Sequence, residues 1–213
     1  MQVGLVFDVW VGHGPLELLR AAVERARALT CARPATGRTH DDADEILGTF
    51  ATDSALGFDP FPLLRALNRA GARTVMIGQV AGILHGSVEL TGDLDLLWDG
   101  DPSQAEALSA AFDAAGCHLL DDDGVPIALG PEAFLQPKVQ FESPQASGDC
   151  CTPALPWGAL PVRDFLGRAL TASGPDGLEV CYLRREDLVL MRRAVGRPKD
   201  MRRADELERL RDR

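Results

Sequence analysis

Two aspartates, Asp93 and Asp95, stand two positions apart in a short apolar run of the chain. Residues 93–98 are predicted to form a strand, and side chains two apart on a strand point to the same face. The two backbone positions then lie roughly 7 Å apart, from about 3.3 Å of rise per residue, so both carboxylates can converge on one cation. Magnesium prefers oxygen ligands and keeps positions for water and substrate phosphates. The pair therefore predicts a Mg²⁺ (or Mn²⁺) site.

A glycine-centred junction precedes the two aspartates. Residues 73–77 are rich in β-branched side chains, which predicts a short strand, and residues 80–85 indicate the start of a helix. Gly78 and Gln79 lie between these two elements. A helix N-terminus presents free backbone N–H groups that suit phosphate, and glycine permits close approach of the backbone. We therefore expect Gly78 and Gln79 to form a phosphate cradle beside the metal site.

Residues 75–96 as a whole resemble the signature of the minimal nucleotidyltransferase (DNA polymerase β-like) superfamily. That signature is a Gly-Gly or Gly-Ser pair, followed further along by Asp-x-Asp or Asp-x-Glu. The resemblance is greatest to stand-alone bacterial members, including toxins of the AbiEii and MenT type. Residues 186–200, rich in arginine, are similar to the closing helices of such proteins. Gln79 departs from the pattern, because the family usually has glycine or serine there.

The resemblance implies further site residues. A third carboxylate is expected on a later strand of the same sheet, where Asp149 is the best match and Glu142 is the alternative. Asp149 would act as base or join Asp93 and Asp95 as a metal ligand. Besides Gly78 and Gln79, three basic side chains are expected at the nucleotide, namely Lys138, Lys199 and one of the pair Arg192 and Arg193, of which Arg192 is preferred.

The resemblance also implies an activity. Such an enzyme moves a nucleoside monophosphate from a nucleoside triphosphate to an acceptor hydroxyl and releases pyrophosphate. The acceptor would be a tRNA or a protein, and a cognate antitoxin would be a partner, as in toxin–antitoxin systems. Two alternatives stay open. One is an antibiotic-modifying adenylyltransferase, and the other is a weak or inactive relative that serves as an interaction module.

Composition narrows the class of protein. The chain has 213 residues, of which 46% are hydrophobic and 25% charged, enough for a proper core. No apolar run approaches the roughly 18 residues of a membrane span, and the start lacks the basic residues of a signal peptide. We expect a cytoplasmic protein with no membrane partner. The net charge of −10 excludes a broad nucleic-acid-binding surface, although residues 183–213 hold 11 Lys or Arg against 7 Asp or Glu.

Five cysteines are spread irregularly along the chain, and no Cys-x-x-Cys pair occurs. A zinc site is therefore excluded, and we expect reduced thiols, several of them buried. The five are Cys31, Cys117, Cys150, Cys151 and Cys181.

The order of elements predicts an α/β (α+β) fold, with a small mixed, twisted sheet flanked by helices. Residues 1–57 are expected to be an appendage of unknown role, and residues 58–213 the nucleotidyltransferase-like domain with C-terminal helices. Ser103 is the expected N-cap of a helix over 103–115. Further helices are predicted at 16–29, 60–70, 185–195 and 199–211, and further strands at 3–11, 125–129, 138–142, 149–152 and 180–182.

Overall fold

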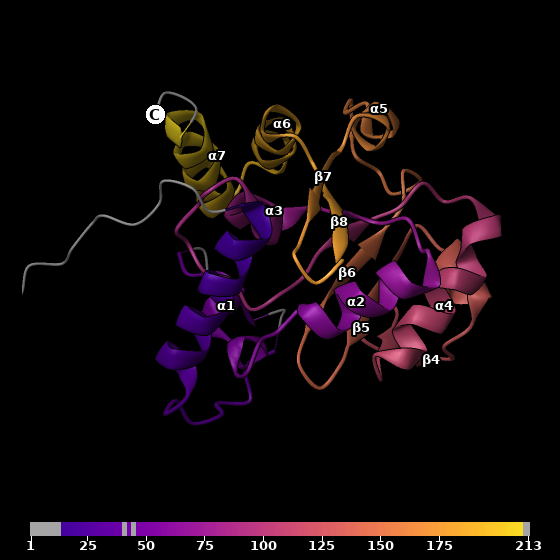
Figure 1. Ribbon diagram of the computed structural model, residues 1–213, viewed down its shortest axis with the longest axis horizontal. Coiled ribbons are helices and arrows are strands. Elements are labelled where there is room, and N and C mark those ends of the chain that lie inside the picture. Colours follow the sequence, from indigo (N-terminus) through magenta and orange to yellow (C-terminus); the bar gives the residue numbers. More distant parts are fainter. Residues whose placement is uncertain (1–13, 40–41, 44–45, 211–213) are drawn as a thin grey trace, which may run out of the picture.

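A computed structural model describes residues 14–39, 42–43 and 46–210 of the chain. Within these residues, one mixed sheet of eight strands is covered by seven α-helices (Figure 1). The helices are α1 (Pro15–Thr30), α2 (Phe61–Ala70), α3 (Gly78–Leu84), α4 (Ala105–Ala114), α5 (Val162–Gly167), α6 (Arg185–Val195) and α7 (Pro198–Leu210). The strands are β1 (Val75–Met76), β2 (Leu96–Leu97), β3 (His118–Leu120), β4 (Pro126–Ile127), β5 (Lys138–Glu142), β6 (Ser147–Cys151), β7 (Leu170–Ser173) and β8 (Glu179–Tyr182).

The strand order is β4-β3-β5-β6-β2-β1-β8-β7. At the centre, β2 runs parallel to β6 and antiparallel to β1, which in turn runs parallel to β8. The backbone ahead of β2 continues this pairing, because the N–H of Leu94 donates to the carbonyl of Ser147 at 2.8 Å. Gly148 permits the close approach, since a Cβ there would lie 2.0 Å from the carbonyl oxygen of Leu94. The segment that carries Asp93 and Asp95 is thus held against β6.

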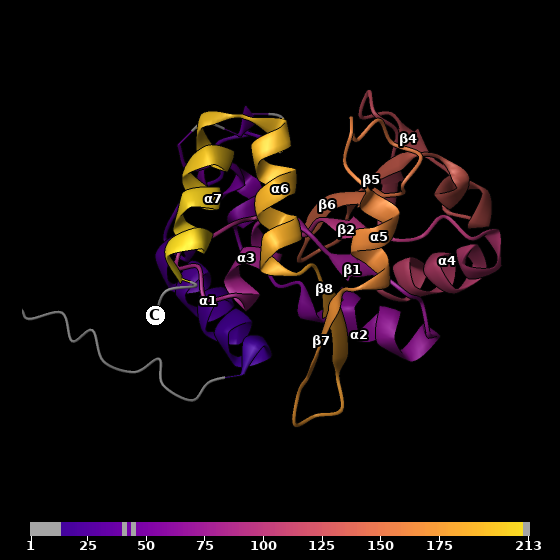
Figure 2. The ribbon, with the colours of Figure 1, turned by 90° about the horizontal axis from the view of Figure 1, so that it is seen from above.

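The helices end where the sequence expects them to end. Gly71 follows α2 with φ 68°, and Gly196 follows α6 with φ 73°. Both values lie in the left-handed region, which glycine enters at little cost. Gly196 allows α6 and α7 to form a helical hairpin, and Figures 1 and 2 both place these two helices side by side.

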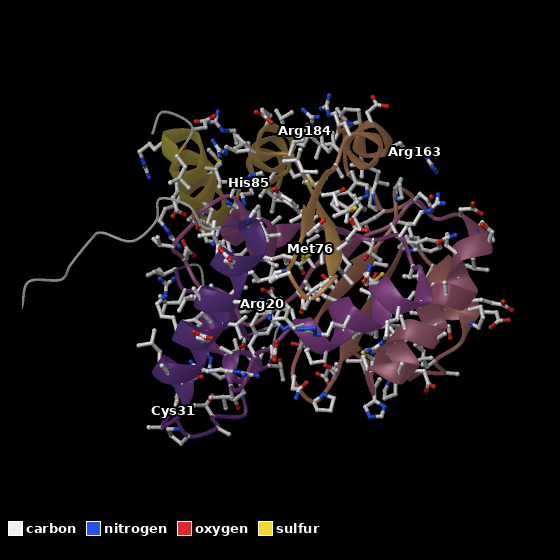
Figure 3. The ribbon with its side chains drawn as sticks, viewed as in Figure 1. Arg20, Cys31, Met76, His85, Arg163 and Arg184 are labelled. Carbon is white, nitrogen blue, oxygen red and sulfur yellow. The ribbon has the colours of Figure 1, made fainter. Side chains whose placement is uncertain are left out.

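The described residues before residue 58 pack onto the rest of the chain. Helix α1 lies against α3, and Leu19 is fully buried in the same core as the sheet. Arg20, labelled in Figure 3, forms an ion pair with Asp176 at 2.9 Å and lies over the Phe61 ring at 4.6 Å. This part of the chain therefore shares the core of the molecule.

The predicted α/β class is confirmed, and so are the helices over 16–29, 60–70, 185–195 and 199–211, to within one residue at each end. The strand over 93–98 is shorter than expected, because only Leu96 and Leu97 pair on both sides. Two strands, β3 and β7, were not predicted. The expected strand over 3–11 lies outside the described residues.

The expected cap of the helix over 103–115 was wrong. A 3₁₀ turn (Pro102–Gln104) precedes α4, and Asp101 caps it by accepting a hydrogen bond from the backbone N–H of Ser103 at 3.0 Å. Aspartate is as strong an N-cap residue as serine, and Pro102 fits the first helical position after it.

In the part of the chain that the structure describes, no helix combines the length and apolar character needed to cross a membrane.

His85 makes stability depend on pH. Its Nε2–H donates to the carbonyl of Leu183 at 2.8 Å, and its ring lies 5.0 Å from the Tyr182 ring. Burial lowers the pKa of His85 below its ordinary value of 6.5, and the hydrogen bond offsets this only in part. Below that value the unfolded chain binds the proton more readily, so His85 favours unfolding as the pH falls.

We expect His85→Gln to reduce the loss of stability between about pH 7.5 and about pH 5.5, measured as the urea midpoint at each pH. Glutamine keeps a donor for Leu183 but does not titrate. His118→Gln is the matched control for the substitution, because His118 is exposed. Equal pH dependence in all three proteins would contradict this role of His85.

Candidate functional site

A cavity of about 660 Å³ lies between the end of the central strands and the α6–α7 hairpin. Its size is typical of a pocket for a small-molecule ligand. The structure brings all eight residues that the sequence singled out to this one cavity, namely Gly78, Gln79, Asp93, Asp95, Lys138, Asp149, Arg192 and Lys199. Glu142, the alternative to Asp149, is exposed near the far end of β5 and does not line it.

Three carboxylates gather at the end of the central strands. Asp95 directly precedes β2, and Asp149 lies on the neighbouring strand β6. Burial raises the pKa of Asp95 well above its ordinary value, and the negative charges of Asp93 and Asp149 raise it further. The backbone N–H of Asp149 and the charge of Arg203 oppose this shift only in part. The cluster is therefore a site of unfavourable negative charge that a cation would stabilise.

Asp93 is oriented by two threonines. The Thr49 hydroxyl donates to its Oδ1 at 2.9 Å, and the Thr91 hydroxyl donates to the same oxygen. The Thr49 oxygen also accepts the backbone N–H of Gly92 at 3.2 Å. Thr49 comes from a 3₁₀ turn (Thr49–Ala51) far from the aspartates in the sequence, so the segment before residue 58 contributes to this site.

The donor set of the cluster suits a hard cation such as magnesium, which is bound through carboxylate oxygens. Among the residues that the structure describes, however, no group of three or more His, Cys, Asp or Glu side chains is arranged to hold a metal ion. Asp93 and Asp95 provide two such oxygen donors, and Asp149 is engaged with a lysine. A magnesium ion here would need substrate oxygens to complete its coordination, which is how proteins usually bind it.

Gly78 allows Asp95 to reach its place. Its φ of 61° lies in the left-handed region, and a Cβ at this position would lie 2.0 Å from the Oδ2 atom of Asp95. Any other residue here would displace the carboxylate or the turn. The helix that follows, α3, has only seven residues, so its dipole adds little at this end.

The side chain of Gln79 does not point its amide N–H groups at a phosphate in the way the sequence predicted, because the protein itself accepts them. It is only 3% exposed, and its amide nitrogen donates to the Ser87 hydroxyl at 2.9 Å and to the Glu89 carbonyl at 2.8 Å. Its oxygen accepts from Arg192. Glutamine at this position therefore packs beneath the turn instead of blocking the cavity.

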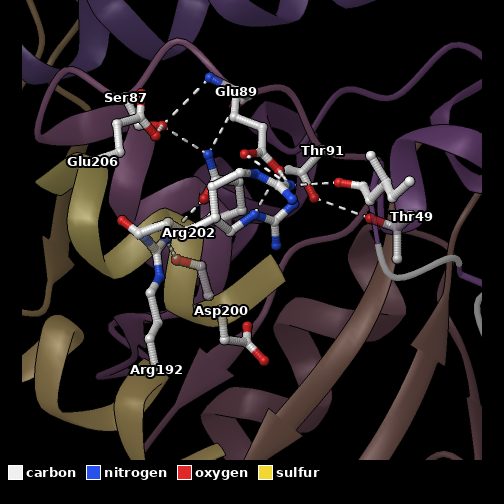
Figure 4. A network of polar contacts seen from close by, with 12 residues as sticks. Thr49, Ser87, Glu89, Thr91, Arg192, Asp200, Arg202 and Glu206 are labelled. Carbon is white, nitrogen blue, oxygen red and sulfur yellow. Dashed lines mark hydrogen bonds and ion pairs between the residues drawn. The ribbon is translucent and has the colours of Figure 1, made fainter. Parts of the chain in front are cut away.

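Arg192 connects three segments of the chain (Figure 4). Its guanidinium donates to the Gln79 side chain at 2.8 Å, to the Gly78 carbonyl at 3.1 Å and to the Arg203 carbonyl at 3.0 Å. The side chain is 5% exposed, and burial lowers its pKa to about 10, so it remains charged near neutral pH. Arg192 is thus held as a brace between α6, α7 and the Gly78 turn, although it was expected at the nucleotide.

Lys138 is also engaged with protein groups. Its Nζ lies 2.8 Å from Asp122 Oδ1 and 3.9 Å from Asp149 Oδ1. Burial lowers the pKa of Lys138, but the hydrogen bond to Asp122 and the charge of Asp149 together outweigh burial and raise it above its ordinary value. Asp149, the third carboxylate of the cluster, therefore has the positive charge of Lys138 beside it.

Several residues of the cavity were not predicted from the sequence. Thr49, Asp122, Trp157 and Arg203 all line it. Arg203 is 7% exposed, its Nε donates to Glu89 at 2.7 Å, and its Nη2 is buried without a hydrogen-bond partner among the described residues. Asp122 lies in a run of three aspartates at 121–123. No local pattern distinguishes these residues from their neighbours, because each reaches the cavity only through the fold.

The cysteines are free thiols, and Cys117, Cys150 and Cys151 are buried, as expected. Cys151 lines the cavity, but burial raises its pKa far above the ordinary value. Since the thiolate is the reactive form, Cys151 contributes packing and no nucleophile. Cys31 lies exposed at the C-terminal end of α1 (Figure 3).

No protein-family model matches the chain, and no curated protein sequence matches it significantly. The function must therefore be argued from the geometry of the cavity.

Replacing Gly78 should reveal the close contact with Asp95. We expect Gly78→Ala to lower the free energy of unfolding by at least about 1 kcal/mol more than Gly71→Ala, measured by urea denaturation. Gly71 is the matched control, because its φ of 68° is similar but no atom lies within 4 Å of the added Cβ. Equal losses in the two variants would mean that Asp95 does not approach the turn as described.

Replacing Arg192 should expose its role as a brace. Arg192→Ala leaves two buried oxygen acceptors and one partly buried one without their donor, so we expect a loss of about 2–5 kcal/mol in the free energy of unfolding. Arg193→Ala is the control, because that side chain is exposed and bonds to Glu208 and Asp205 on the surface. Its cost should stay below about 1 kcal/mol. Similar urea midpoints for the two variants would contradict this assignment.

Proposed function

We propose that this protein is a Mg²⁺-dependent nucleotidyltransferase with a nucleotidyltransferase-type fold. It would take a nucleoside triphosphate, transfer the nucleoside monophosphate to an acceptor hydroxyl and release pyrophosphate. The observation that carries the proposal is the pairing of opposite charges in one cavity. A cluster of three carboxylates faces buried basic side chains from α7, and a triphosphate with its cation needs both.

Asp93 and Asp95 would hold the cation. Burial, together with the negative charges of Asp93 and Asp149, raises the pKa of Asp95, and a cation bound here would offset that negative charge. A bound magnesium ion would supply charge neutralisation for the phosphate oxygens. Thr49 and Thr91 orient one oxygen of Asp93.

Arg203 and Lys199 are the residues we assign to the phosphates. Lys199 is 6% exposed and Arg203 7%, and both line the cavity. A Cβ at Gly48 would lie 3.2 Å from Arg203 Nη2 and 3.8 Å from Lys199 Nζ, so the two cationic groups face the same glycine. The N–H groups of Arg203 Nη2 donate to no described residue, and a phosphate oxygen would accept their hydrogen bonds.

Asp149 is the candidate general base. It would accept the proton of the acceptor hydroxyl as that oxygen bonds to the α-phosphorus and the bond to pyrophosphate breaks. The Nζ atom of Lys138 lies 3.9 Å from Asp149 Oδ1, so a positive charge stands beside the proposed base. The acceptor would be a tRNA, a protein or an antibiotic hydroxyl, and the toxin of a toxin–antitoxin system is the biological role that this activity fits.

One observation favours a second candidate, a catalytically inactive interaction module. In the described part of the chain no three acidic, histidine or cysteine side chains form a ready metal site. A protein of this kind would bind neither nucleotide nor metal at the cavity, so the same experiment separates the two candidates.

The test is transfer of label from each α-labelled nucleoside triphosphate to total RNA or protein, with magnesium present. We expect the double change Asp93→Asn/Asp95→Asn to reduce transfer by about a thousandfold, which corresponds to the several kcal/mol that a metal ion contributes. Asp99→Asn is the matched control. Asp99 lies shortly after Asp93 and Asp95 in the chain, but it lines a different cavity. This variant should retain activity.

Transfer that survives in the double variant would place the chemistry elsewhere. If the unchanged protein transfers no label and binds no triphosphate by calorimetry, the enzyme proposal is wrong and the interaction module remains.

A further inference from the structure

The cavity is lined by apolar as well as charged side chains. Besides the charged groups, it is lined by a tryptophan, Trp157, by its neighbour Leu155, and by apolar side chains of α6. Leu188 and Met191 stand three positions apart on α6, so they share one face of the helix. The charged groups suit phosphates and a cation, but they do not explain why an aromatic ring borders the same space.

The Trp157 side chain is anchored through the polar edge of its indole ring. Its indole Nε1–H donates to the Thr152 carbonyl at 2.8 Å, and its backbone N–H donates to the Leu155 carbonyl at 2.8 Å. Thr152 is itself fixed, because its backbone N–H donates to the Pro137 carbonyl at 2.8 Å. The polar atom of the indole is therefore satisfied by the protein.

The position of the ring follows from this tether. Thr152 comes directly after Cys151, which lines the cavity at the end of β6, the strand that carries Asp149. Trp157 is only half-buried, in contrast to Trp98, which is 1% exposed and belongs to the core. A half-buried ring with its polar edge satisfied keeps part of its carbon surface open to a ligand, in this cavity and in the neighbouring hollow lined by Pro153 and Pro161.

We infer that Trp157 is the stacking platform for a nucleobase, and that this base belongs to the nucleoside triphosphate of the proposed reaction. The inference rests on the proposed function and names its base subsite. One ligand with a triphosphate at one end and a flat heterocycle at the other fits a cavity with basic residues and an indole. Stacking accepts every base but grows with ring area, so purine triphosphates should bind more tightly than pyrimidine triphosphates.

The experiment is calorimetric titration, in the presence of magnesium, with ATP, UTP, inorganic tripolyphosphate and a short oligoadenylate. We expect Trp157→Ala to weaken ATP binding by about 5- to 150-fold, the range for loss of one stacked base. Tripolyphosphate, which has no base, should bind both proteins within about twofold of each other. Trp157→Phe retains a ring and should recover most of the ATP affinity.

Four results would overturn the inference, and they are distinguishable. If wild type binds ATP no more tightly than tripolyphosphate, there is no base subsite, although the proposed function stands. If Trp157→Ala weakens both ligands equally, the ring is structural. If it weakens binding of a short oligoadenylate but not of ATP, the ring serves the acceptor. Absence of binding by any of these ligands would remove the proposed function itself, together with the inference.

Discussion

Mutual repulsion among Asp93, Asp95 and Asp149 is the constraint on which the rest of the site depends. Parallel pairing of β2 with β6 brings these carboxylates to one end of the sheet, and partial burial reduces the ability of water to screen them. The surroundings respond with opposite charge. Lys138 lies beside Asp149, and the charge of Arg203 lowers the pKa of Asp95 in part. A bound cation would offset the negative charge that Lys138 and Arg203 leave uncompensated.

A second network, of hydrogen bonds and ion pairs, supports this cluster from α6 and α7. The Arg192 guanidinium connects the Gly78 turn to α6 and α7, and Glu89 connects to α7 through Arg203. Glu206 of the same helix accepts from the Ser87 hydroxyl at 2.7 Å. Since buried polar groups are costly when unpaired, such a network resists movement of any one member. The basic side chains of α7 are thereby held over the cavity.

The segment before residue 58 is part of the same architecture. Its helix α1 lies against α3, and Thr49 reaches the carboxylate of Asp93. Gly92 is required for this contact, because a Cβ there would lie 2.6 Å from the backbone nitrogen of Ala55. A segment that looks independent in the sequence therefore completes the site.

The sequence by itself determined the features that depend on neighbouring residues. The spacing of Asp93 and Asp95 set their common face, and the glycines after α2 and α6 set where those helices end. The roles of Gln79, Arg192 and Lys138 could not be predicted in this way. The partners of these three side chains come from segments about 10 to 115 residues away in the chain. Glutamine and arginine can each donate to a phosphate or to a buried carbonyl, so residue type does not decide between these two partners. Only the tertiary structure placed Gly78, Glu89 and Arg203 around these groups, since packing and desolvation act between segments that the sequence leaves far apart.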